Sequence, residues 1–269
     1  MLATVATVSL LTLLGAMFVL WLVSLRLEDA SIVDPFWGVA FAIIAGVGYG
    51  LGHGRPERRL LALVLVTLWA LRLSGYLLLR RGHGEDHRYA AMRQRHGARF
   101  WWLSGLMVFG LQAFLALAVS LPLLAAATRG ATRPLGVLDF AGAGLWLAGL
   151  LCEAIADAQL ARFKRAPGNR GQVMDRGLWR YSRHPNYFGE FLLWWGLGLI
   201  GLGAGVAWAL LGPALLTVLL LRVSGVTLLE AALRERRPAY VDYIRRTSAF
   251  IPWRPREVPP EIDSIRAPR

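Results

Sequence analysis

Apolar runs long enough to cross a bilayer recur along this chain, and they constrain its fold more than any other feature. Hydrophobic residues make up 56% of the 269 residues, and the mean hydropathy is +0.47. This apolar content is too high for an ordinary soluble domain. A helix of about 20 apolar residues, in contrast, spans the hydrocarbon core of a bilayer and pairs its backbone N–H and C=O groups internally. We therefore predict an all-α, polytopic integral membrane bundle.

Seven segments are apolar enough to be spanning helices. They are Leu2–Leu25, Pro35–Leu51, Leu60–Leu79, Leu103–Thr128, Leu135–Leu160, Tyr187–Leu202 and Gly205–Leu221. Pro213 interrupts the last segment, so we expect a kink there or a merger of the last two segments around Gly201–Gly205. One membrane domain over residues 1–253 and a flexible tail over 254–269 follow from this pattern.

The net charge of +13 comes from basic residues that fall between the apolar runs. There they would meet anionic headgroups or phosphorylated ligands, so we do not expect nucleic acid as a partner. With seven spans, Arg26, Arg80–Arg99, Arg162–Arg183 and the C-terminal region share one side of the membrane. The positive-inside rule places that side in the cytoplasm, with the N-terminus outside and the C-terminus inside.

Several kinds of site have no sequence signal. Cys152 is the single cysteine and lies in an apolar run, and none of the five histidines has a recognisable ligand set around it. We therefore expect no disulfide and no metal site. The glycine-rich turn of a Rossmann module, the P-loop and the HExxH motif are also missing, so any cofactor must lie among helices.

The fifth span carries unusual charges for a membrane helix. Glu153, Asp157 and Lys164 stand at i, i+4 and i+11, which places two carboxylates and the single lysine on one helix face. Charged residues in a membrane helix usually mark a site or a pathway. The alternative is that they form internal salt bridges that stabilise the bundle.

The loop before the sixth span could bind an anion. Pro185 suits the first turn of a helix, so free backbone N–H groups near Asn186 and Tyr187 would lie beside the guanidiniums of Arg180 and Arg183. Arg183, Asn186 and Glu190 stand at i, i+3 and i+7 and share a face that runs into the span. Interfacial anchoring would explain Arg180 but gives no reason for Asn186 or Glu190.

Further polar residues stand near the same side of the membrane. Glu230 opens a basic C-terminal helix on which Tyr240, Tyr243 and Arg246 follow at helical spacing. An amphipathic helix that lies at the membrane surface and has no role in a site explains this pattern equally well. In the N-terminal half, Asp34 opens the second span, Arg72 lies within the third, and Glu85–Tyr89 follows it. His184 is a candidate proton donor, but a lone interfacial histidine is more often a hydrogen-bonding residue.

Three segments together resemble the steroid 5-alpha-reductase superfamily, more narrowly its bacterial membrane-protein branch. They are EAIADAQLARFK at Glu153–Lys164, GLWRYSRHPNYFGE at Gly177–Glu190 and YIRRTSAFIP at Tyr243–Pro252, and DPFWG at Asp34–Gly38 matches more loosely. The resemblance implies a seven-helix bundle in a bacterial inner membrane. It also implies an oxidoreductase that uses NADPH, held by residues of about 150–253, to reduce a carbon–carbon double bond in a steroid-like or other lipid enone.

The resemblance also assigns residues to the cofactor. Asn186 and Glu190 match positions that contact the nicotinamide end. Asp157 and Lys164 match an acid and a base on the adenosine and phosphate side, where Glu153 takes the place of a polar residue. Neighbours of the same cofactor would be Arg183, Tyr243 and Arg246. By their position in the sequence, Arg180, Tyr187 and Glu230 are further candidates for cofactor binding.

The segment that activates the substrate departs from the family. Steroid enzymes use a glutamine and glutamate pair on the second helix and a tyrosine on the third. Here the second helix offers only Asp34, and the third carries Trp69 near Arg72. We therefore expect Asp34, Tyr89 or His184 to donate the proton, with Arg72 as the orienting charge.

Two other functions remain open. S-adenosylmethionine-dependent membrane methyltransferases of lipids or isoprenylcysteine share ArgHisProXaaTyr and a distal glutamate-rich helix, but Ala231 follows Glu230 where a second glutamate would stand. A non-catalytic membrane protein that binds a lipid would tolerate substitution of Asn186 and Glu190. The identity of the hydrophobic substrate and the oligomeric state stay undetermined by the sequence.

Overall fold

The structure is a computed structural model that describes residues 1–81, 84–223, 230 and 239–257. Every regular element in these residues is helical, so the all-α prediction is confirmed. The chain divides into two compact units: unit 1 comprises Met1–Leu150 and Phe191–Thr217, and unit 2 comprises Leu151–Glu190 and Val218–Arg269. Helices α8 (Val137–Arg165) and α9 (Pro185–Gly203) each contribute residues to both units.

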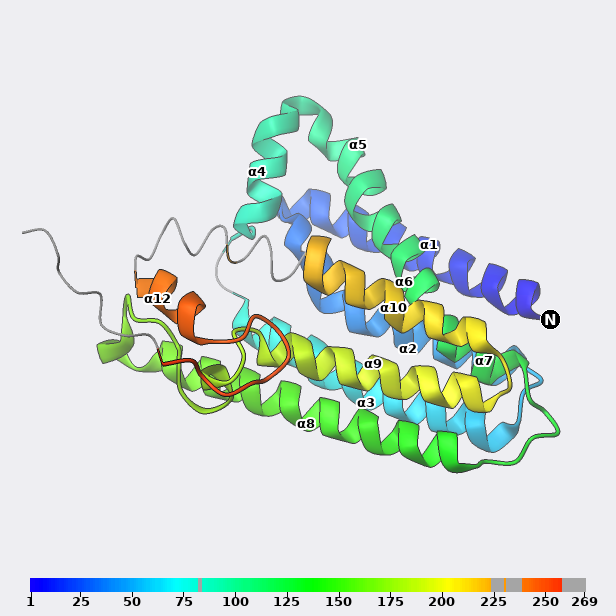
Figure 1. Ribbon diagram of the computed structural model, residues 1–269. Helices are drawn as coiled ribbons and strands as arrows, with labels where there is room; N and C mark the ends of the chain where they lie inside the picture. Colours follow the sequence, from blue (N-terminus) through cyan, green and yellow to red (C-terminus); the bar gives the residue numbers. More distant parts are fainter. Residues whose placement is uncertain (82–83, 224–229, 231–238, 258–269) are drawn as a thin grey trace, which may run out of the picture. The chain divides into compact units, whose positions relative to one another are not determined.

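Unit 1 contains most of the apolar helices (Figure 1). Its elements are α1 (Leu2–Leu27), η1 (Ala30–Ile32), α2 (Val33–Leu51), α3 (Pro56–Arg80), α4 (His87–His96), η2 (Gly97–Arg99), α5 (Phe100–Ser104), η3 (Gly105–Gly110), α6 (Leu111–Val119), α7 (Leu121–Thr128), the first half of α8 (Val137–Arg165), the second half of α9 (Pro185–Gly203), η6 (Ala207–Leu210) and α10 (Leu211–Val218).

The core of unit 1 lies where α2 packs along α3. A Cβ atom at Gly38 would lie 3.0 Å from the Cα atom of Ala70, so glycine permits this close approach. Phe41, Trp69 and Trp194 are fully buried beside it, and their rings pack in pairs with centroids 4.6 to 5.6 Å apart. Aromatic packing therefore joins α2, α3 and α9 within unit 1.

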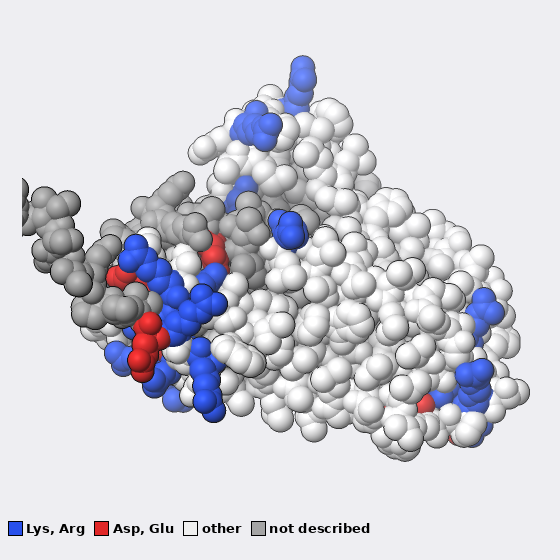
Figure 2. All heavy atoms as spheres, in the orientation of Figure 1, with Lys and Arg blue, Asp and Glu red and all other residues white. Residues whose placement is uncertain are grey.

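Five helical segments are long and apolar enough to cross a membrane, so the chain is a polytopic membrane protein. They are Leu2–Leu27, Ala30–Leu51, Pro56–Arg80, His87–Val119 and Val137–Arg165. The other two predicted spans also form helices, but Ala207–Arg222 is shorter and α9 carries Asn186 and Glu190. In Figure 2 the visible face of the helices is almost free of charged side chains, as contact with lipid requires.

Two details differ from the sequence prediction. The single span expected over Leu103–Thr128 is wrong, because α6 ends at Val119 and α7 begins at Leu121 with Pro122 in its first turn. Proline lacks the N–H that would continue the hydrogen-bond ladder. Of the two alternatives, a kink at Pro213 or a merger around Gly201–Gly205, the merger is absent, since α9 ends at Gly203 and the chain turns at Gly205 with φ +92°.

A buried ion pair in unit 1 was not foreseen. Arg58 is completely buried, and its Nε and Nη2 atoms lie 2.7 and 2.9 Å from the two carboxylate oxygens of Asp139. The carbonyl oxygens of Gly130, Arg133 and Pro134 accept its remaining hydrogen bonds. This pair therefore ties the first turn of α3 to the first turn of α8.

Unit 2 is built around the connection between α8 and α9. Its elements are the second half of α8, η4 (Pro167–Asn169), η5 (Gly177–Arg180), the first half of α9, η7 (Leu219–Val223) and α12 (Ala239–Arg246). The predicted helix between η7 and α12 lies outside the described residues except for Glu230, and so does the predicted tail beyond residue 257. The described residues 254–257 have no regular structure.

Candidate functional site

The centre of unit 2 is a polar contact between α8 and α9. Glu153 and Asp157 stand one turn apart on α8, and each is only 3% exposed. The side-chain amide of Asn186, in the first turn of α9, donates a hydrogen bond of 3.2 Å to Asp157. Asp157 and Asn186, which the resemblance assigned to different ends of one cofactor, are thus bonded to each other, whereas Lys164 lies further along α8 and is exposed.

Three more predicted site residues lie just before α9 or within its first two turns. The rings of His184 and Tyr187 are stacked, with centroids 5.5 Å apart and planes 4° from parallel. Glu190 follows Asn186 by one helical turn and is half-buried. The beginning of α9 therefore presents an amide, a carboxylate and an aromatic ring within two turns.

Arg183 is held firmly by the protein itself. Its Nε and Nη2 atoms donate to the carboxylate of Glu230 at 2.7 and 3.2 Å, and its Nη1 atom donates to the carbonyl oxygens of Ile244 and Thr247 at 2.9 and 2.7 Å. A guanidinium has five N–H donors, so four of them are already used. This geometry favours a positioning role for Arg183 and Glu230 over direct contact with a cofactor.

His184 belongs to the same cluster. Its Nε2 atom lies 3.2 Å from Oε1 of Glu230, and its backbone N–H donates to Oγ of Ser182. Burial by itself would raise the pKa of the Glu230 carboxyl, but hydrogen bonds from His184 and Arg183 lower it below its ordinary value. Glu230 is therefore a carboxylate that orients both neighbours.

Tyr243 fastens α12 to the loop before α9. Its hydroxyl donates to the carbonyl oxygen of Trp179 and lies 3.3 Å from that of Ser182. Burial, followed by the nearby Tyr240, raises the pKa of the Tyr243 phenol, so it remains a neutral donor. The backbone N–H of Arg183 also donates to the carbonyl oxygen of Ser248 at 2.9 Å. These hydrogen bonds hold the C-terminal segment against the loop before α9.

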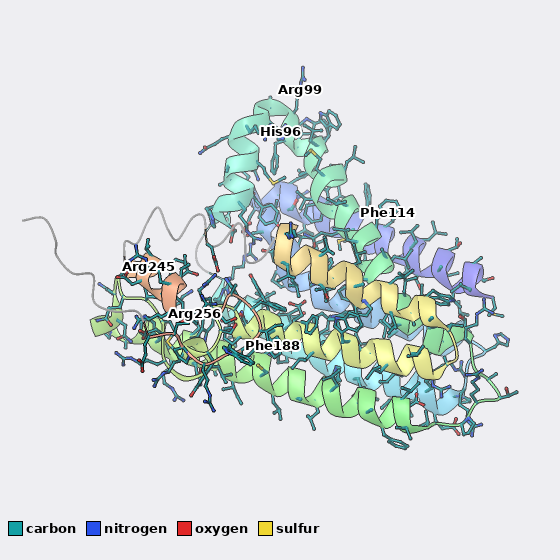
Figure 3. The ribbon with its side chains drawn as sticks, in the orientation of Figure 1. His96, Arg99, Phe114, Phe188, Arg245 and Arg256 are labelled. Carbon is teal, nitrogen blue, oxygen red and sulfur yellow. The ribbon has the colours of Figure 1, made fainter. Side chains whose placement is uncertain are left out.

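An open cavity of about 540 Å³ lies beside this loop within unit 2. Its lining contains four arginines and two carboxylates: Arg176, Arg180, Arg246, Arg256, Asp175 and Glu257. Figure 2 shows blue and red side chains gathered over α12 and the loop region, and Figure 3 labels Arg256 on the segment after α12. The sequence predicted Arg180 and Arg246 as cofactor-binding residues but missed Arg176 and Arg256.

The candidate catalytic residues fall in different units. Asp34, Arg72 and Tyr89 belong to unit 1, whereas His184 belongs to unit 2. Tyr89 donates its hydroxyl hydrogen to Asp34 at 2.6 Å, and Arg88 donates to the other oxygen of Asp34, also at 2.6 Å. Two of the predicted catalytic residues are therefore brought together.

Arg72 has a different neighbour. Its guanidinium lies over the ring of Tyr76, 5.5 Å from the centroid, and Trp69 is buried among the core aromatics. Ion pairs between Asp29 and Arg81 and between Glu85 and Arg93 lie in the same unit. Burial would raise the pKa of Asp29, but hydrogen bonds from Ser31 and Arg81 lower it. The first pair joins the turn before α2 to the end of α3, and the backbone N–H of Ala30 donates to Glu85 at 2.8 Å, which joins the same turn to the segment before α4.

The fold and this polar cluster define a polytopic α-helical membrane protein with a charged C-terminal unit. The chain belongs to the family described as protein of unknown function (DUF1295), whose model matches residues 20–247. The uncharacterized protein C594.04c of Schizosaccharomyces pombe is 31% identical over 213 residues, which cover 68% of this chain and 60% of that protein.

Two curated relatives have a named activity. The 3-oxo-5-alpha-steroid 4-dehydrogenases 1 of Macaca fascicularis and Homo sapiens are 39% and 38% identical over 74 residues, which cover 27% of this chain and 26% of each relative. The chain thus spans about a quarter of these relatives. This distant similarity is consistent with a steroid 5-alpha-reductase-like superfamily. No solved structure matches the chain.

Proposed function

We propose that this protein is an NADPH-dependent membrane reductase of an activated carbon–carbon double bond in a hydrophobic lipid enone. The observation that carries the proposal is the hydrogen bond between Asn186 and Asp157 in unit 2. This hydrogen bond places a side-chain amide beside a buried carboxylate in unit 2. The distant similarity of the chain to two 3-oxo-5-alpha-steroid 4-dehydrogenases supports the same proposal.

The residues of unit 2 fit both ends of NADPH. Asn186 and Glu190 offer hydrogen-bond partners to a carboxamide such as that of nicotinamide, with Tyr187 as a ring neighbour. Glu153, Asp157 and Lys164 would line the adenosine side. Guanidiniums bind phosphate groups well because they offer paired N–H donors. Arg180 and Arg246 line the cavity and would bind the phosphate groups of the cofactor.

The other polar residues of unit 2 would hold this site in shape. Arg183, Glu230 and Tyr243 use their hydrogen bonds on the loop and on α12. Sites of this kind depend on neighbours that fix the orientation of the contacting groups. We assign these three residues to positioning.

When bound, NADPH supplies a hydride for the β-carbon of the enone. The chain must supply the proton that completes the reduction and keep water away from the reacting carbons. His184, whose ring nitrogen faces Glu230, is the candidate donor in unit 2. Asp34 and Tyr89, joined by a hydrogen bond, are the candidates in unit 1, with Arg72 as an orienting charge.

The proposed setting is a bacterial inner membrane. The arginine-rich segments, including those of unit 2, would face the cytoplasm, where NADPH is present, with the N-terminus outside. The substrate would reach the protein from the bilayer, because the described helices present large apolar side chains such as Leu79 and Phe140 on their surfaces.

Deuterium transfer tests the reaction itself. The purified chain in mild detergent would be incubated with NADPH deuterated at the hydride position and with a series of lipid enones, and the products analysed by mass spectrometry. We expect deuterium on the β-carbon of a conjugated enone and none on the matching saturated ketone. Transfer of a labelled methyl group from S-adenosylmethionine, without deuterium incorporation, would show a methyltransferase instead.

A further inference from the structure

We propose that the corner between α4 and α5 is a binding site for the headgroup of an anionic phospholipid, formed by Arg95 and Arg99 together with Trp101 and Trp102. The bilayer around the chain supplies this ligand, and the site lies wholly in unit 1. Neither NADPH nor a lipid enone takes part, so the site is independent of the proposed reductase activity.

The corner projects from the other helices of unit 1. Figure 1 shows α4 and α5 standing away from α1, α2 and α3, and Figure 3 labels His96 and Arg99 at the corner, with Arg99 pointing away from the helices. Arg93 of α4 donates to the carbonyl oxygen of Glu28, just beyond the end of α1, at 3.1 Å. Since α1 is long enough to span a bilayer, a segment that extends sideways from its end lies at the level of the lipid headgroups.

The corner is uniformly basic. Residues 87–104 contain four arginines and no aspartate or glutamate. Arg88 and Arg93 already pair with carboxylates of unit 1. Within the described part of the chain, the exposed side chains of Arg95 and Arg99 form no hydrogen bond and no ion pair. Their guanidiniums therefore offer unused N–H donors to a phosphate group.

Two exposed tryptophans follow these arginines. Trp101 is 57% exposed and Trp102 is 42% exposed, and the exposed side chains of Leu106 and Met107 continue the apolar surface along the chain. A corner that faced water alone would expose two indole rings at a cost in hydrophobic free energy. Indole rings are instead enriched at the headgroup level of a bilayer. The combination of unpaired guanidiniums and exposed indoles therefore fits a lipid headgroup better than a soluble anion.

The corner is formed before any lipid binds. Gly97, at φ +53°, ends α4 and turns the chain, in a backbone conformation that favours glycine. The guanidinium of Arg93 lies 4.7 Å from the ring centroid of Phe100 and donates two hydrogen bonds of 2.9 Å to Glu85. The turn therefore places Arg95, in the last turn of α4, and Arg99, directly before α5, on one corner.

Helix α5 is also fastened to α1. The indole N–H of Trp21 donates to the carbonyl oxygen of Trp101 at 3.0 Å and lies 3.3 Å from Oγ of Ser104. A Cβ atom at Gly105 would lie 3.1 Å from the ring of Trp21, so glycine permits this close approach. The protein thus holds the backbone of Trp101 while its side chain stays exposed, which lowers the cost of ordering the surface when a lipid binds.

Dissociation constants for the first bound lipid, measured by native mass spectrometry on the full chain in mild non-ionic detergent, test the site. The chain would be titrated with phosphatidylglycerol and, separately, with phosphatidylcholine of the same acyl chains. One arginine beside an anionic lipid surface contributes about a fivefold gain in affinity, so the double variant Arg95→Gln, Arg99→Gln should weaken phosphatidylglycerol about 25-fold. Phosphatidylcholine should bind as before. The double variant Arg95→Lys, Arg99→Lys keeps both charges and should keep most of the preference.

The double variant Arg129→Gln, Arg133→Gln is the matched control, because it removes the same charge from exposed arginines of unit 1 between α7 and α8. The control should keep the preference for phosphatidylglycerol, and lipid-free melting temperatures should be equal in all variants. A wild type without this preference, or an equal loss in the control and in the Arg95 and Arg99 variant, would overturn the site. Displacement of the lipid by inorganic phosphate would show a site for soluble anions instead, and a lower melting temperature of the Arg95 and Arg99 variant would show a structural role.

Discussion

The guanidinium of Arg183 and the carboxylate of Glu230 face each other along two hydrogen bonds, of 2.7 and 3.2 Å, in the interior of unit 2. Removing one member of a buried pair leaves the other charge without compensation and costs about 3–5 kcal/mol. We predict a loss of this size in the free energy of unfolding for Glu230→Ala, measured by denaturant titration in detergent. The exposed Glu257→Ala serves as the control, and equal stability of the two variants would contradict a structural role for the pair.

The same carboxylate predicts a pH dependence. Because the folded-state pKa of Glu230 lies below its ordinary value of 4.5, its contribution to stability is complete above that value and is lost as the pH falls through the folded pKa. Melting temperatures from about pH 3 to pH 6 should therefore fall more steeply in the wild type than in Glu230→Gln. Parallel curves for the two proteins would show that the carboxylate is not the group that titrates.

Asn186 is the most informative position for the cofactor. Asn186→Ala removes the amide that Asp157 orients, and we expect the dissociation constant for NADPH to rise about tenfold, equivalent to one hydrogen bond. Asn169→Ala is the matched control, since that amide bonds the carbonyl oxygen of Phe163 and belongs to no proposed contact. An equal rise in both variants would indicate a general effect on the loop.

The pair of Tyr89 and Asp34 can be tested separately from binding. Tyr89→Phe removes the hydroxyl that donates to Asp34, and turnover should fall by a factor of about 10² if this pair relays the proton, with the affinity for NADPH unchanged. Tyr76→Phe keeps the ring that Arg72 covers and should retain activity. Full turnover in Tyr89→Phe would reduce the pair to a structural contact.

The buried pair of Arg58 and Asp139 should contribute to stability alone. Arg58→Leu is expected to cost about 3–5 kcal/mol because Asp139 is left buried and unpaired. The double variant Arg58→Leu, Asp139→Leu should recover much of this loss, with wild-type affinity for NADPH. A double variant less stable than Arg58→Leu alone would contradict this account, and melting curves of the three proteins provide the comparison.

The sequence was sufficient for the class of fold. The spanning runs follow from the energetic cost of exposing polar groups to lipid, which is a local property. Helical spacing places Asp157 and Asn186 on definite faces of their own helices, but the contact between them was not predicted, because spacing within one helix does not specify which residues of another helix it meets. The break at Ser120 was missed, although Pro122 in an apolar run was a usable signal.

The spacing of residues along the sequence could not predict the arginine-lined cavity or the ion pair between Arg58 and Asp139. Arg176 and Arg256 are brought together by a turn at Gly177 and by backbone hydrogen bonds of the C-terminal segment. Arg58 precedes the predicted third span, Leu60–Leu79, yet α3 begins at Pro56 and buries Arg58 against Asp139. Both arrangements depend on contacts between residues far apart in the chain, which no local pattern specifies.

Calorimetric titration of the purified wild-type chain with NADPH, and separately with S-adenosylmethionine, tests the central claim most directly. The account predicts saturable binding of NADPH to one site per chain, weakened in Asn186→Ala, and no binding of S-adenosylmethionine. Saturable binding of S-adenosylmethionine with no response to NADPH would contradict it.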